Sequence, residues 1–194
     1  MSRTGAISSL ALLALCPALA ACEVVIDAPA ATKAWTFEND QDKYEGWNWN
    51  PGPVVPLPAG AMFEWMKDAG RAGSAIKFTL PFTTTDQLAD FTTVLDPTDL
   101  RGKTICASVE YTAPEAPDLS AIIAVYASSN NGNNYVDTVA APTGGWQVVC
   151  LSVDDPKRDT DLLLARDAIT QIGVSFFAGN APTTTTILLD DIAY

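Results

Sequence analysis

The chain has 194 residues, no histidine and a formal net charge of −12. The acidic balance disfavours binding to nucleic acid and to anionic membrane surfaces, and it disfavours polyanionic glycans unless a cation bridges them. The lack of histidine excludes Ser-His-Asp and Cys-His catalytic groups and most zinc sites, because these depend on imidazole. The apolar residues suffice for one sizeable core, so we expect a single domain.

The first 21 residues are typical of an export signal. Arg3 is the only charged side chain before Cys22, and an apolar run extends from residue 6 to residue 21. That run is too short for an ordinary membrane-spanning helix. It ends in Leu19-Ala20-Ala21-Cys22. This sequence resembles the bacterial lipobox, in which the cysteine becomes the first mature residue and is diacylated on sulfur.

We therefore predict a lipoprotein that is anchored to a bacterial membrane through palmitate-type acyl chains on Cys22. Two or three acyl chains hold a protein firmly on a bilayer. Glu23 follows the cysteine where an aspartate would indicate inner-membrane retention, and this favours the outer membrane. Residues 22–33 form the lipidated cysteine and a tether that spans at most about 35 Å when extended. The alternative is ordinary cleavage, for instance after Ala20, which would release a secreted protein.

Residues 34–194 have the pattern of an all-β domain. Short segments rich in Thr, Val, Ile and aromatic residues alternate with turn-forming Gly, Pro, Asn and Asp. The stretch 39–50 is polar and turn-prone. Residues 159–168 could form a short helix or a helical turn or two within a connection. The predicted strands are 33–38, 61–66, 74–80, 91–95, 104–112, 120–128, 135–139, 146–153, 170–177 and 184–193.

Two of the four cysteines lie inside predicted strands. Cys16 belongs to the signal and Cys22 would carry lipid, which leaves Cys106 and Cys150 as an even pair in an oxidising compartment. We predict a disulfide that ties two strands together, with two buried free thiols as the alternative. In the chain-entropy model such a bridge contributes about 3–4 kcal/mol of stability.

Both ends of the domain carry a strand with carboxylates. The first strand ends on Glu38, and the last contains Asp190 and Asp191. Carboxylates brought together from the two ends would repel each other unless a hard cation such as Ca2+ neutralised them. The alternative is that these acids are solvated.

The order of several short motifs resembles the jelly-roll carbohydrate-binding modules of the galactose-binding-domain-like superfamily. The sequence opens with Phe37-Glu38, Asp40 and Gly46-Trp47, and it ends with Asp190-Asp191-Ile192. Between them lie the segments 99–111, 144–153 and 169–179, which are similar to the middle of such modules. The resemblance implies a two-sheet antiparallel β-sandwich, the jelly roll.

The resemblance also implies a structural calcium site. In the resembled modules the glutamate after the first phenylalanine and the first aspartate of the final motif are ligands, together with backbone carbonyls. Here these residues are Glu38 and Asp190, with Asp40 as a further ligand and carbonyls from 70–74. Asp191, one residue along the strand, is expected to point to the opposite face.

A carbohydrate site should contain aromatic rings for stacking and polar side chains for the sugar hydroxyls. In the resembled modules such groups line a concave sheet face or the loops at one edge. We favour Trp49 and Tyr135, which lie in asparagine-rich surroundings, over Trp65 and Tyr126, and each of the four has a place in the core as its alternative. The hydrogen-bonding candidates are Asn48, Asn50, Asn130 and Asn134, and the aromatic residues expected in the core are Trp35, Phe37, Trp47 and Trp146.

We predict a non-catalytic module that binds a polysaccharide through surface aromatic residues and is held on a membrane by its lipid anchor. The alternative is a structural or interaction lipoprotein that uses the same fold without binding sugar. A jelly-roll glycosidase or lyase is a third hypothesis with little support. Glu64, Glu110 and Asp137 lie on predicted strands, but no compact carboxylate pair of the kind glycosidases need is present.

Overall fold

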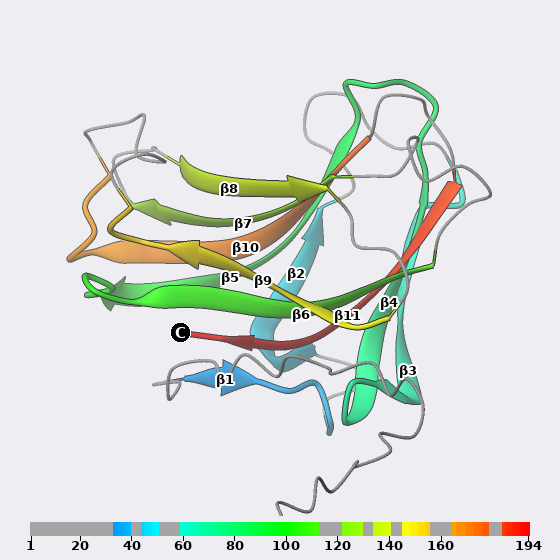
Figure 1. Cartoon of the computed structure of the whole chain (residues 1–194), viewed down its shortest axis with the longest axis horizontal. Helices are drawn as coiled ribbons and strands as arrows, with labels where there is room; N and C mark the ends of the chain where they lie inside the picture. The colour runs from blue at the N-terminus through cyan, green and yellow to red at the C-terminus, as the bar shows by residue number, and fades with distance from the viewer. Residues whose placement is uncertain are drawn as a thin grey trace, which may run out of the picture.

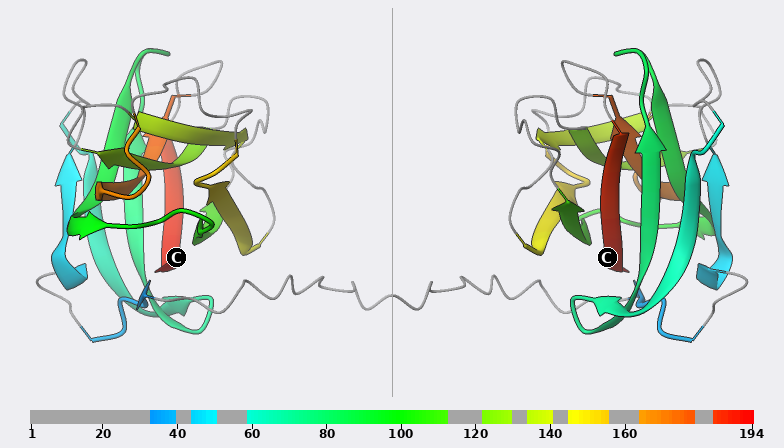
Figure 2. Two further views of the ribbon diagram at one scale, coloured as in Figure 1. Left: turned by 90° about the vertical axis from the view of Figure 1, so that its left-hand side faces the viewer. Right: turned by 90° about the vertical axis from the view of Figure 1, so that its right-hand side faces the viewer.

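The computed structural model consists of two antiparallel β-sheets that face each other (Figures 1 and 2). It describes residues 33–39, 44–50, 59–112, 122–129, 134–140, 145–155, 164–178 and 184–194. The predicted all-β sandwich is therefore confirmed. The predicted signal peptide, Cys22, Asp40 and Asn130 lie outside the described residues.

The larger sheet contains both ends of the domain. Its strand order is β3-β4-β11-β6-β9, with β1 paired to β11. The pairing of β1 with β11 is antiparallel and places Trp35 opposite Ile192, so the two chain ends lie side by side as predicted. The bounds are β1 Ala34–Trp35, β3 Met62–Gly70, β4 Gly73–Pro81, β6 Thr104–Thr112, β9 Gln147–Ser152 and β11 Thr184–Ala193.

The smaller sheet has the order β2-β5-β10-β7-β8. A short 3-10 turn, Tyr44–Gly46, leads into its edge strand β2. Every pairing in this sheet is antiparallel, and β10 lies in its centre between β5 and β7 (Figure 1). The bounds are β2 Trp47–Asn50, β5 Leu88–Thr98, β7 Ile122–Ser129, β8 Asn134–Ala140 and β10 Ile169–Phe177.

The core lies between the sheets and follows from alternation along the strands. In β5, Ala89, Phe91, Thr93 and Leu95 are buried, whereas the residues between them are half-buried or exposed. Aromatic rings fill one end of the core, where Trp47 stacks on Phe91 with ring centroids 5.2 Å apart. The predicted core positions of Trp35, Phe37 and Trp47 are confirmed, and Trp146 is half-buried just before β9.

Strand β2 was not expected, because Trp47–Asn50 follows a polar segment and was predicted to be turn-like. It forms a strand because Trp47 and Trp49 alternate with two asparagines, so one face is aromatic and the other polar. The segment 159–168 was a candidate helix, and the part of it that the structure describes, residues 164–168, contains a turn and a bend. Strands β6 and β11 have the predicted bounds.

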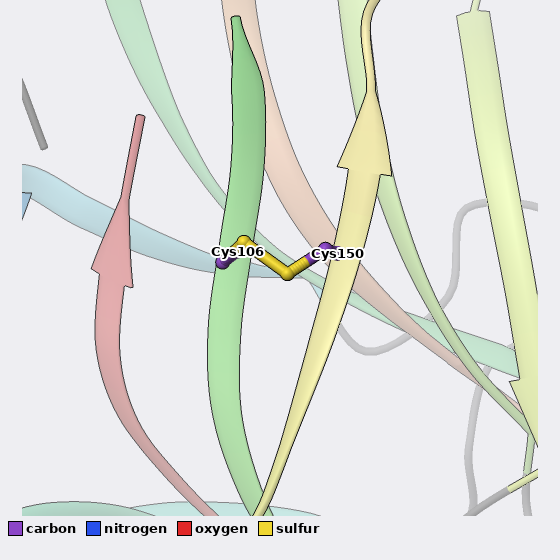
Figure 3. Close-up of a disulfide and its surroundings, with 2 residues drawn as sticks. All are labelled: Cys106 and Cys150. Atoms are coloured by element: carbon purple, nitrogen blue, oxygen red, sulfur yellow. A yellow bond between two sulfur atoms is a disulfide. The ribbon is translucent and has the colours of Figure 1, made fainter. Parts of the chain in front are cut away.

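The predicted disulfide is present between Cys106 and Cys150 (Figure 3). The two residues are direct partners in the pairing of β6 with β9, and β9 is an edge strand of the larger sheet. The bridge closes a loop with a sequence separation of 44 residues. In the chain-entropy model a loop of this length contributes about 4 kcal/mol.

The backbones of the two ends of the described domain are hydrogen-bonded to each other. The Lys33 amide donates to the Tyr194 carbonyl and the Tyr194 amide donates to the Lys33 carbonyl, each at 3.1 Å. Lys33, where the described part of the chain begins, therefore lies beside the C-terminal residue. Among the described residues, no helix is long and apolar enough to cross a membrane.

Candidate functional site

Two regions of the molecule concentrate carboxylates and polar groups, and the first is where the chain ends meet the β3–β4 turn. Both carboxylate oxygens of Glu38 lie 3.1 Å from the Ser74 amide, which donates to them. Gly73 has a φ of +106°, and a Cβ added there would overlap the Glu38 carboxylate. The turn therefore needs glycine at this position both for its backbone conformation and for the close approach of Glu38.

Asp190 is buried on the other side of the same turn, with 0% of its surface exposed. Its Oδ2 accepts a hydrogen bond from the Arg71 amide at 2.9 Å, and its Oδ1 accepts one from the Asp191 amide at 2.8 Å. Desolvation, followed by the charge of Asp191, raises the pKa of Asp190 to about 6. This carboxylate is therefore costly to ionise unless a cation compensates it.

Asp191 was expected to point to the face opposite Asp190, but a β-bulge at Asp191 interrupts the alternation on which that expectation depends. The pairing of β11 with β6 shifts between Asp190 and Ile192, and Asp191 has a φ of +47°. The extra residue lets Ile192 return to the core after Leu189 without placing Asp191 there. Burial and the charge of Glu38 raise the pKa of Asp191, whereas Arg71 lowers it, so these groups lie within electrostatic reach of one another.

The oxygens of this region fit the chemistry of a hard cation. Glu38, Asp190 and Asp191 supply carboxylates, and the Ser74 carbonyl and Asp190 Oδ2 both lie against Gly70. Ca2+ prefers such a mixture of carboxylate and carbonyl oxygens. Within the described ranges, no three His, Cys, Asp or Glu side chains converge as a metal-binding cluster. A cation here would therefore need backbone carbonyls, water or Asp40 to complete its ligands.

The second region is the outer face of the smaller sheet, the side turned away from the core. Three rows of directly paired residues cross this face. Neighbouring rows are about 7 Å apart and neighbouring strands about 4.8 Å apart, as in any antiparallel sheet. The rows are Asn50-Asp90-Ser175-Ala124, then Asn48-Thr92-Gly173-Tyr126, then Val94-Gln171-Ser128.

Tyr126 lies along the middle row. A Cβ added at its partner Gly173 would be 2.5 Å from Tyr126 Cε1 and 2.6 Å from Cζ, so the ring covers the glycine. The hydroxyl crosses β10 and hydrogen bonds to Thr92 on β5. Desolvation and the charge of Asp90 raise the pKa of Tyr126, and the hydrogen bond to Thr92 offsets part of that rise. The ring is therefore held flat against the sheet, although only 8% of the residue is exposed.

Polar side chains are joined in pairs around this ring. The Gln171 amide donates to Thr92 Oγ1 at 3.2 Å, and the Ser175 hydroxyl donates to Asp90 Oδ1 at 2.5 Å. Burial raises the pKa of the half-buried Asp90, and the bond from Ser175 partly offsets that rise. This face thus combines an aromatic ring with fixed donors and acceptors, a combination suited to sugar hydroxyls.

Trp49, one of the two favoured stacking residues, faces the core. Its ring lies 5.6 Å from that of Phe63 and 5.3 Å from that of Phe78, centroid to centroid. Asn48 and Asn50 are exposed on the opposite face of β2. Trp49 and these asparagines were predicted to contribute to one site, but alternation along the strand separates them.

The other predicted ligand residues are dispersed. Trp65 is half-buried on β3 of the larger sheet, and its indole N–H donates to the Phe37 carbonyl at 2.6 Å. Tyr126 is on the smaller sheet, as is the backbone of Tyr135, which pairs with Ala127. Of the predicted ligand residues with described side chains, the structure brings Tyr126, Asn48 and Asn50 to one face.

Sequence reasoning missed four residues of this face: Asp90, Thr92, Gln171 and Ser175. The signal was present in part, because Asp90 and Thr92 alternate with Ala89, Phe91 and Thr93 in a strand that is apolar on one side. The predicted site consisted of aromatic residues and asparagines, so polar side chains in the centres of strands were not among its candidates.

Comparison with known proteins supports the fold. No protein-family model matches the chain, and no curated protein matches it. Among solved structures, a family 28 carbohydrate-binding module specific for non-crystalline cellulose has a TM-score of 0.58 and 11% identity, over 82% of this chain and 91% of that one. The family 11 module of a cellulosomal cellulase of Clostridium thermocellum has a TM-score of 0.50 and 17% identity, over 76% and 87%.

An exo-β-agarase structure is also similar, with a TM-score of 0.58 and 14% identity over 82% of this chain. The match covers 24% of the agarase chain, so this protein corresponds to about a quarter of it. At these identities the similarity establishes the fold. The chain has the β-sandwich of jelly-roll carbohydrate-binding modules, as the sequence motifs implied.

Proposed function

We propose that this protein is a non-catalytic module that binds a polysaccharide on the outer face of its smaller sheet. The observation that carries the proposal is the arrangement around Tyr126, whose ring is held over Gly173 and whose hydroxyl is bonded to Thr92. Asn48, Thr92 and Gln171 lie on the same face and offer groups that both donate and accept hydrogen bonds.

The proposal places sugar on this face rather than on Trp49, because the Trp49 ring is committed to core contacts with Phe63 and Phe78. Stacking on Tyr126 would use the ring face that does not contact Gly173. Because 8% of Tyr126 is exposed, stacking requires the groups that cover this ring face to move aside. Tyr135 and Asn130 remain candidate ligand residues from the sequence.

We further propose that Ca2+ joins the chain ends through Glu38 and Asp190, with Asp40 as a further ligand. The burial of Asp190 and the charge of its acidic neighbour Asp191 support this proposal. The role of the ion would be structural. We also propose that the module is exported and lipid-anchored at Cys22, with the outer membrane favoured, or secreted if the lipobox is not used.

The test is affinity electrophoresis of residues 23–194, with the disulfide formed, in gels that contain neutral polysaccharides such as mixed-linkage β-glucan, galactomannan and agarose. We expect at least one polysaccharide to retard the protein. The double variant Asn48→Ala/Asn50→Ala should lose most of that retardation. The control variant is Thr79→Ala on β4, a half-buried position of the larger sheet that faces away from the core.

A folded protein that no polysaccharide retards would overturn the proposal. That result would favour the alternative, an interaction lipoprotein with this fold. Equal retardation of the double variant and the wild type would show that the polysaccharide does not bind on this face.

A further inference from the structure

The charges of the smaller sheet are of one sign. Strands β2, β5, β7, β8 and β10 contain no lysine or arginine, whereas β5 contains Asp90 and Asp96 and β8 contains Asp137. Asp90 is half-buried near the centre of the outer face, and Asp96 is exposed near the end of the strand. A ligand on this face therefore meets a carboxylate with no opposite charge on the strands around it.

Asp90 is held in place from one side. Its direct partners across the sheet are Asn50 on β2 and Ser175 on β10. Ser175 is buried, with 5% of its surface exposed, and its hydroxyl donates to Asp90 Oδ1. Among the described residues, Ser175 is the side chain that donates a hydrogen bond to Asp90. The bond holds the carboxylate in one position, and Asp90 stays partly exposed on the outer face.

We propose that Asp90 is the specificity-determining residue of this face, accepting hydrogen bonds from hydroxyl or ammonium groups of a sugar and excluding sugars that carry carboxylate or sulfate. This inference rests on the proposed function. A partly desolvated carboxylate accepts strong hydrogen bonds from such donors, and it repels a second anion because few water molecules or cations screen the pair. Ser175 is a positioning residue that acts through Asp90.

The surrounding groups fit the same selection. Thr92 and Gln171 are neutral and already bonded to each other, so neither supplies the positive charge that a uronate or sulfate would require. The formal net charge of −12 also repels polyanionic glycans at long range. Asp90 adds a short-range contribution that a single substitution can remove, which makes the two effects separable.

The experiment uses the neutral polysaccharide that retards the wild type and the same polysaccharide after partial carboxymethylation of its hydroxyls. Dissociation constants are measured for the wild type, Asp90→Asn, Asp96→Asn and Ser175→Ala at one fixed salt concentration. Asp96→Asn is the matched control, because it makes the same change of charge on the same strand. Urea unfolding of each variant monitors the fold.

We expect Asp90→Asn to bind the neutral polysaccharide about tenfold more weakly, because a bond to a charged acceptor is lost. The same variant should bind the carboxymethylated form at least as well as the wild type does, so its preference for the neutral form should fall by tenfold or more. Asp96→Asn should keep the wild-type ratio. Ser175→Ala should reduce the ratio by a few fold, because the carboxylate is less well positioned.

Two results would overturn the inference while leaving the proposed function intact. One is a wild type that binds the carboxymethylated polysaccharide as tightly as its neutral parent. The other is an Asp90→Asn variant that folds and keeps the wild-type ratio, which would make Asp90 a purely structural residue. If no polysaccharide retards the wild type, the proposed function itself fails and this inference fails with it.

Discussion

The two carboxylate-rich regions differ in what holds their acids. Where the chain ends meet the β3–β4 turn, Glu38 and Asp190 accept hydrogen bonds from the backbone amides of Ser74, Arg71 and Asp191. On the outer face of the smaller sheet, Asp90 accepts its bond from the Ser175 side chain. Backbone donors form part of a turn and cannot reorient separately, whereas a hydroxyl can rotate and share its bonds with a ligand.

The difference indicates a division of roles. The first region joins segments that are far apart in the sequence, since 119 residues separate Arg71 from Asp190. Its hydrogen bonds therefore tie together distant parts of the chain. The second region sits on strands whose other side is packed in the core, and it combines the exposed Asn48 with the buried Tyr126 and Ser175. Three experiments test this division.

The largest effect is expected for Gly73→Ala. Alanine disfavours a φ of +106°, and its methyl group would displace the Glu38 carboxylate. We expect a loss of about 3 kcal/mol in the free energy of unfolding, measured with urea. Gly60→Ala is the control, because Gly60 has a φ of +108° with nothing within 4 Å of the added methyl. It should lose about 1 kcal/mol of stability. Equal losses for the two variants would show that the contact with Glu38 does not contribute to the stability of the turn.

A smaller effect is expected from pH and calcium at Asp190. The pKa of Asp190 is about 6 in the folded protein, above its ordinary value of 3.8. The folded protein therefore favours the protonated form of Asp190. Without calcium, the stability that this form contributes is fully present below pH 4 and is lost as the pH rises through 6. The loss should be on the order of 2 kcal/mol.

Calcium should reverse that loss. The ion binds the ionised carboxylate, so calcium should raise the melting temperature at pH 7 and have little effect at pH 4. Differential scanning calorimetry with calcium or with a chelator measures this difference. An Asp190→Asn variant should show neither the pH dependence nor the full response to calcium. Identical melting curves with and without calcium at pH 7 would contradict the proposed site.

The smallest effect on stability, but a large one on binding, is expected for Gly173→Ala. The added methyl would push the Tyr126 ring off the sheet, and a ring at an outer face can move more easily than backbone. We expect about 1 kcal/mol of lost stability and a loss of polysaccharide retardation. Tyr126→Phe keeps the ring and loses the bond to Thr92, so it should retain most of its retardation. If Gly173→Ala is retarded as the wild type is, Tyr126 is not the stacking platform.

Much of the fold could be predicted from local pattern. Strands β6 and β11 alternate strongly and have the predicted bounds, and two cysteines left as a pair within predicted strands indicated a bridge. Strand β2 escaped prediction because four residues between polar and Pro-Gly segments carry a weak periodic signal. The β-bulge at Asp191 also escaped, because the strand's alternation shows no break until its partner β6 sets the register.

The candidate site was less predictable than the fold. Tyr126 was a candidate for its aromatic ring, but its position over Gly173 depends on the pairing of β7 with β10. Trp49 was favoured because its neighbours are asparagines, yet those neighbours are on the other side of the strand. Composition around a residue therefore did not identify the face on which its side chain lies.

The sequence by itself determined the fold class, the disulfide pair and the acidic character of the protein. These properties depend on residue type and on alternation over a few neighbours, which any segment carries within itself. Tertiary structure alone decided which face of each strand is buried, and it placed Ser175 against Asp90 from 85 residues away. Such contacts depend on strand order and register, which are set by the packing of the whole sandwich.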